Sequence, residues 1–201
     1  MNTAIKMPLR SLDPVLVRDL QEKYPAAVVS IEVGASAESA TMDERQFWNM
    51  LALLDWGRKR NEDIIAPAVE ALSRFSEEDI FCFDQILAEK LHALNGEAFA
   101  KPLGWGDAGG QYFSVDVFLH ARCCAVANGK AFYEKVLKNP ARMPKECSFE
   151  PLLYLAEKAH RLKTGGDRYD FLPSVSYETF GNKDGWPGMP SFSDLIKGKG
   201  K

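Results

Sequence analysis

The sequence predicts a mainly α-helical fold of the α+β class, a multi-helix globular domain with one small strand pair. Apolar side chains recur at three- and four-residue intervals through most of the 201 residues, as in helices packed on a core. Two short segments, 27–33 and 174–180, instead alternate apolar and polar residues, as strands do. Because they lie near opposite ends of the chain, we expect them to pair and join the N- and C-terminal segments.

Helix boundaries are marked by capping residues, prolines and glycines. Thr41 with Glu44 forms a capping box, Ser76 precedes three acidic residues, and Gly129 can close a helix in a left-handed turn. Pro67 predicts either a kink or a later start in its helix. The expected helices are residues 12–23, 41–57, 61–75, 76–94, 114–129, 130–138 and 149–163.

These elements divide the chain into three expected parts. Residues 1–41 form a helix–strand extension, residues 42–187 a helical domain, and residues 188–201 a tail rich in lysine and glycine. A hydrophobic fraction of 46% with 12 phenylalanines is enough for a substantial core. No apolar run approaches the roughly 20 residues of a membrane helix, and no secretory signal begins the chain. We therefore expect a cytoplasmic protein with no membrane contact.

Charge and cysteine content exclude several classes of function. The net charge of −3 does not favour nucleic acid. Residues 41–100 carry 6 basic and 12 acidic side chains, which is typical of a solvated surface and, less often, of a face for a basic partner. The four cysteines form no C-x-x-C pair, so no metal and no cofactor are expected, and reduced thiols are the default.

Arg122 is the most informative residue of the chain. It falls in the middle of the apolar arc of the helix over 114–129, where a guanidinium needs a carboxylate or a polar cavity. The favoured interpretation is a structural ion pair that links helices, with Asp84, with Asp55 or in the neighbourhood of Asp116. The functional alternative is an anion-binding arginine at the floor of a pocket rimmed by aromatic residues, namely Trp105, Tyr112 and Trp186.

One pair of residues on the same helix suggests proton chemistry. Asp116 and His120 are four residues apart and share a helix face, which is half of a catalytic arrangement. No motif supplies a nucleophile to complete it, so an exposed local pair is the favoured interpretation and no catalytic residue is assigned. His160, on the apolar side of its helix, is expected to be a hydrogen-bonded core histidine.

A set of short motifs resembles a bacterial domain of unknown function, family 4240, over roughly residues 42–186. The resemblance implies a bacterial, mostly helical domain. It implies no activity, so no catalytic residue can be transferred, and it does not extend to residues 1–41. The motifs are Met42 to Trp48, Leu53 to Trp56, Phe113 to Cys123, Val126 to Lys130, Tyr177 to Thr179, and Gly185 with Trp186.

The leading functional hypothesis is a non-catalytic binding module that recognises a protein partner, as an accessory, sensor or immunity-type protein. The absence of an assembled nucleophile, metal or phosphate motif favours it, together with tryptophans expected to be exposed in loops and the acidic middle of the chain. The rival hypothesis is a small-molecule site, enzymatic or sensory, in which Arg122 holds an anion and Asp116 or His120 transfers protons. A structural or self-associating role is the third alternative, and the oligomeric state is left open.

Overall fold

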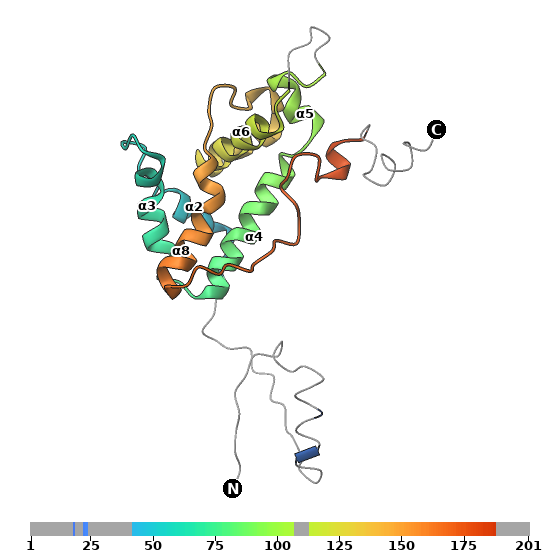
Figure 1. The fold of residues 1–201 in the computed structure, drawn as a ribbon. Helices are drawn as coiled ribbons and strands as arrows, with labels where there is room; N and C mark the ends of the chain where they lie inside the picture. Colours follow the sequence, from blue (N-terminus) through green and yellow to red (C-terminus); the bar gives the residue numbers. More distant parts are fainter. Residues whose placement is uncertain (1–17, 19–21, 24–41, 107–112, 188–201) are drawn as a thin grey trace. The chain divides into compact units, whose positions relative to one another are not determined.

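The computed structural model describes residues 18, 22–23, 42–106 and 113–187. Within these residues there are seven α-helices and no strand (Figure 1). The chain divides into two units, residues 1–39 and 40–201. The α-helices are α2 (Glu44–Leu51), α3 (Asn61–Leu72), α4 (Glu77–Ala93), α5 (Glu97–Ala100), α6 (Val115–Ala127), α7 (Lys130–Lys138) and α8 (Leu155–Thr164). Short 3₁₀ helices are η2 (Lys101–Leu103), η3 (Pro140–Arg142), η4 (Glu150–Tyr154) and η5 (Lys183–Gly185).

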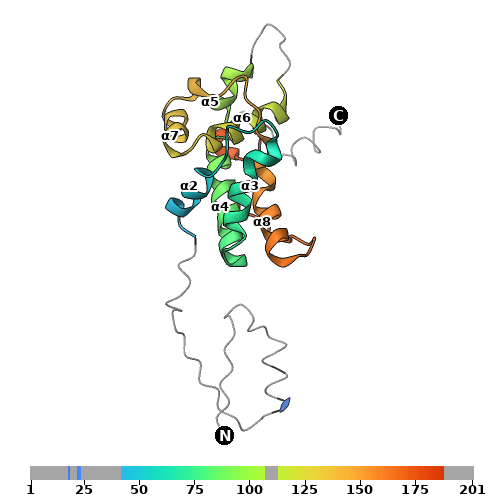
Figure 2. The ribbon, with the colours of Figure 1, turned by 90° about the vertical axis from the view of Figure 1, so that its left-hand side faces the viewer.

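The domain is built on α4 and α6. Helix α8 packs against α3 and α4, and α6 packs against α4, α7 and η4. Figures 1 and 2 show α3, α8 and α4 side by side, with α6 toward one end of this layer. The face of α4 that carries Ile80, Phe83, Leu87 and Leu91 is fully buried. The mainly helical prediction is confirmed.

The helix starts follow the predicted signals, with one change of register. Ser76 caps α4 by accepting from Asp79 N–H, and Ser114 caps α6 by accepting from Val117 N–H. Helix α2 is capped by Asp43, whose capping box uses Gln46 rather than the expected Thr41 and Glu44. The sequence holds two overlapping capping-box patterns, Thr41 with Glu44 and, two residues later, Asp43 with Gln46. The second is the one that forms.

The predicted strand at residues 174–180 is wrong. This stretch belongs to the return segment, defined here as residues 165–187, which crosses α4 as irregular backbone (Figure 1). Its polar groups bond to side chains of α4 and of the turn that follows it instead of to another strand: Gln85 to Ser174, His92 to Ser176 and Asn95 to Glu178. Phe180, with φ of 72°, also interrupts an extended path. The other predicted strand, 27–33, lies outside the described residues.

Two close approaches fix the end of the return segment. Asn95 is fully buried, donates to the Glu178 carbonyl at 2.6 Å and accepts from Trp186 Nε1 at 2.9 Å. Gly185 passes so near the end of α4 that a Cβ on it would lie 2.4 Å from the Asn95 carbonyl oxygen and 2.9 Å from Gly96 Cα. The docked position of the segment therefore requires that residue 185 have no side chain.

The cysteines do not follow the expectation of four reduced thiols. Cys124 of α6 forms a disulfide with Cys147, whereas Cys82 and Cys123 are free. The sequence alone held no signal for this pairing, because Cys147 lies in an irregular stretch whose position depends on tertiary packing.

None of the helices in the described residues is both long enough and apolar enough to cross a membrane.

Candidate functional site

Arg122 is completely buried, as its place on the apolar arc predicted. Its Nη1 donates to the carbonyls of Leu91 at 3.0 Å and Tyr177 at 2.8 Å, and its Nη2 donates to Thr179 Oγ1 at 3.2 Å. Its guanidinium lies over the Phe118 ring, 4.6 Å from the centroid, while Nε–H has no hydrogen-bond partner within the described ranges. Burial lowers the pKa of Arg122 to about 10, which still leaves it charged at neutral pH.

The expected ion pair between Arg122 and Asp84 or Asp55 is not formed. Asp84 accepts a hydrogen bond from the Tyr169 hydroxyl at 2.9 Å, and Asp55 pairs with Arg58 at 2.9 Å. Backbone carbonyls replace the carboxylate as acceptors, because the return segment brings an unpaired carbonyl directly to the guanidinium. Arg122 therefore joins α4, α6 and the return segment through neutral acceptors.

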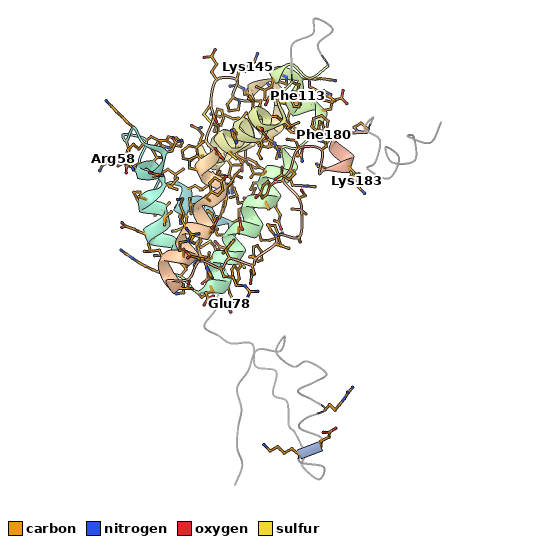
Figure 3. The ribbon with its side chains drawn as sticks, viewed as in Figure 1. Arg58, Glu78, Phe113, Lys145, Phe180 and Lys183 are labelled. Atoms are coloured by element: carbon orange, nitrogen blue, oxygen red, sulfur yellow. A yellow bond between two sulfur atoms is a disulfide. The ribbon has the colours of Figure 1, made fainter. Side chains whose placement is uncertain are left out.

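The aromatic residues expected to rim a pocket over Arg122 form a packed cluster. Trp105 and Trp186 meet edge to face with ring centroids 5.0 Å apart, and Trp186 is buried. Phe113 and Phe180 both pack on Trp105, and Figure 3 shows them at the same end of the domain. Tyr112 lies outside the described residues. The geometry thus gives no support to an anion held by Arg122, whose Nη groups already donate to protein acceptors.

A cleft of about 590 Å³ opens elsewhere, between α6, α8, η4 and the return segment, with Asp84 of α4 at its wall. It contains Asp116 and His120 from the predicted set, but not Arg122, Trp105 or Trp186. Asp116 is exposed at the first turn of α6, and His120 lies one turn further along the helix. The structure therefore brings together two of the six predicted ligand-binding residues and one of the ion-pair candidates.

The lining of this cleft is acidic and aromatic. Five carboxylates contribute to it, none of its lining residues is a lysine or arginine, and His120 is its only basic titratable group. Tyrosine and phenylalanine rings alternate with aliphatic side chains over the remaining surface. The carboxylates are Asp84, Asp116, Glu150, Glu157 and Glu178, and the aromatic residues are Tyr154, Tyr169, Phe171 and Tyr177.

Hydrogen bonds hold several of these side chains in place. Ser148 and His120 Nδ1 are 3.1 Å apart, and the Tyr154 hydroxyl donates to Glu150 at 2.9 Å. Arg122 fixes the backbone at Tyr177, next to Glu178, so it positions one wall without lining it. Arg122 is a positioning residue for the cleft in this sense.

Asp84 is the most perturbed carboxyl group of the cleft. Burial raises its pKa to about 6, and the hydrogen bond from Tyr169 offsets part of this rise. Burial and Asp84 together raise the pKa of Tyr169, and burial raises that of Tyr177. At neutral pH the Asp84 carboxylate is mostly ionised in a site where its charge is poorly solvated, which favours a cation beside it.

Asp84→Asn is expected to stabilise the protein at pH 8, by about 2 kcal/mol, and progressively less as the pH falls to 4. The folded state binds the Asp84 proton more tightly than the unfolded chain does. The stability that this proton adds is therefore complete below the pKa of the aspartate in the unfolded chain, and it is lost as the pH rises through about 6. Urea unfolding of both proteins across this range measures the difference. Glu70→Gln, at an exposed site on α3, is the control. A difference that does not change with pH would contradict the shifted pKa.

Sequence patterns had missed most of the cleft. Glu150, Glu157, Tyr169 and Glu178 come from segments far from α6, and their carboxylates and hydroxyls carry no motif. The one usable signal was the Asp116–His120 spacing on α6. In the described residues no group of three or more histidine, cysteine, aspartate or glutamate side chains is placed to hold a metal ion.

Comparison with family models identifies the family of this chain. The model of a family described as a protein of unknown function, DUF4240, matches residues 42–161. This is shorter than the resemblance over roughly residues 42–186, and it stops before the part of the cleft that the return segment supplies. Comparison with curated proteins and with solved structures found no match.

Proposed function

The chain belongs to the DUF4240 family of proteins of unknown function, and from this premise and the geometry of its cleft we propose that it is a non-catalytic binding module that holds a basic segment of a protein partner. The observation that carries the proposal is the lining of the cleft, in which five carboxylates and four aromatic rings meet without a lysine or arginine among them.

The chemistry of the lining matches a lysine or arginine side chain. A carboxylate that is partly desolvated, such as Asp84, gains most from a cation that enters beside it. Tyrosine rings stabilise the same cation through their faces and pack on its aliphatic stem. The acidic rim formed by Asp116 and Glu178 would attract a basic segment from solution and speed its association.

Exposed apolar side chains at the rim favour a protein segment over a small cation. Leu172 is 87% exposed and Tyr154 is 43% exposed, and both line the cleft. Large apolar groups left in water beside charged ones are typical of interaction sites, where they contact the chain on either side of an anchoring residue. A single amine would leave them uncovered.

Fluorescein-labelled hexalysine is expected to bind the full chain, with an affinity that falls as salt rises, and hexaglutamate is expected not to bind. Asp116→Asn with Glu178→Gln should weaken binding about tenfold, because both carboxylates line the cleft and both residues are exposed. Fluorescence anisotropy measures the affinities.

The matched control removes the same charge elsewhere. Glu70→Gln with Glu134→Gln changes two carboxylates on α3 and α7, outside the cleft, and should leave binding unchanged. Equal weakening by both double variants would mean that net charge and not the cleft attracts the peptide, and the proposal would fail. Tighter binding of spermine than of hexalysine would replace the protein partner with a small polyamine.

A further inference from the structure

The disulfide between Cys124 and Cys147 lies next to one wall of the cleft. It closes a 23-residue separation that contains α7 and η3. Cys124 and His120 are four residues apart, so they share a face of α6. They bind two consecutive residues: Cys124 forms the disulfide with Cys147, and His120 is hydrogen-bonded to Ser148. Glu150, which lines the cleft, follows two residues later.

We propose that this disulfide is a redox latch that regulates the cleft: the oxidised chain holds residues 147–150 in the binding geometry, and the reduced chain releases them. The proposal rests on the proposed function, since it assigns a control to the same cleft. Breaking the bond removes the covalent tie to α6 and leaves weaker contacts, among them the Ser148–His120 hydrogen bond and the packing of Phe149, so residues 147–150 are ordered for only part of the time. A site that is ordered for only part of the time binds correspondingly more weakly.

Burial decides which sulfur reacts. Cys124 has no exposed surface, whereas Cys147 is only partly buried, so we expect Cys147 to be the residue that is attacked. The thiolate of a small dithiol attacks Cys147 Sγ, the sulfur–sulfur bond breaks, and its electron pair leaves on Cys124, which takes up a proton. The second thiolate of the dithiol then attacks the mixed disulfide and releases Cys147. Two protein thiols form, and the dithiol becomes a cyclic disulfide.

The free cysteines do not compete in this exchange. Cys123 is fully buried, and burial raises the pKa of its thiol to about 12, so almost none of it is thiolate at neutral pH. Burial also raises the pKa of the Cys82 thiol. Within the described residues, an external dithiol therefore exchanges with the Cys124–Cys147 disulfide.

The test compares the full chain oxidised with glutathione disulfide and reduced with dithiothreitol. Hydrogen exchange read by mass spectrometry should be at least about tenfold faster for the amides of residues 147–152 after reduction, and unchanged in α3. Hexalysine affinity should fall by about tenfold. Cys147→Ser should behave as the reduced chain and ignore dithiothreitol, whereas Cys82→Ser should respond as the unmodified chain does.

Each outcome separates the latch from the proposed function. If reduction does not change amide hydrogen exchange at residues 147–152, the latch is overturned, whatever the hexalysine affinity. Faster exchange with equal hexalysine affinity in both states also overturns it, because the segment would then not control the cleft. No hexalysine binding in either state overturns the proposed function itself.

Discussion

Arg122→Ala is expected to lower the free energy of unfolding by about 3–5 kcal/mol, more than any other single change in α6. The substitution removes a fully buried side chain and leaves the carbonyls of Leu91 and Tyr177 and the hydroxyl of Thr179 without their donor. Urea unfolding at pH 7 measures the loss. Two effects contribute to this loss of stability, the cavity and the acceptors left without a donor. Two further variants separate them.

Arg122→Met fills most of the volume but provides no donor, so the difference between the alanine and methionine variants reports the cavity. Arg122→Lys keeps a charge but replaces the planar fork with a single ammonium, which cannot reproduce the arrangement of three acceptors. We expect lysine to lose about 2 kcal/mol. Arg45→Ala, at an exposed site on α2, should have no measurable effect. A lysine variant as stable as the parent would show that the fork geometry contributes nothing.

Gly185→Ala is expected to be the most damaging change in the return segment, with a loss of about 3 kcal/mol. The new methyl group would lie 2.4 Å from the Asn95 carbonyl oxygen, and that neighbour is backbone at the end of α4, so it cannot rotate away. Movement of the segment would separate Trp186 Nε1 from Asn95 Oδ1, which are 2.9 Å apart. Thermal unfolding monitored by tryptophan fluorescence follows both the stability and the environment of Trp186.

Gly166→Ala is the matched control in the same segment. The nearest atom to its added methyl group would be Thr164 Oγ1 at 3.6 Å, an ordinary contact. Its melting temperature should equal that of the parent or exceed it slightly, because alanine restricts the unfolded chain more than glycine does. If both alanine variants melted alike, the close approach of Gly185 to α4 would not matter for stability.

The helices could be predicted because their signals are local. Ser76, Ser114 and Gly129 lie within one or two residues of the boundaries they mark, and an apolar face repeats along each helix. The same periodicity identified Arg122 as buried. The partners of Arg122 could not be predicted, because a backbone carbonyl looks the same at every position of a sequence and only tertiary structure selects the one at Tyr177.

The cleft and the return segment could not be predicted from the periodicity of the sequence. Residues 174–180 alternate as a strand would, but their hydrogen-bonding groups meet Gln85 and His92 on α4 and Asn95 just after it, whose polar side chains take the place of a neighbouring strand. The carboxylates of the cleft are charged residues on several elements, and each one alone is indistinguishable from a solvated surface residue. Their convergence is a property of the packing.

The return segment also bears on where the module ends. The family match stops at residue 161, inside α8, yet Asp84, Asn95 and Arg122 each have a hydrogen-bond partner beyond it. A chain cut at that point would keep most of the helices but remove these partners of three buried polar side chains, with α8 shortened. The segment matched by the family model is thus shorter than the segment that these hydrogen bonds join, and the difference includes one wall of the cleft.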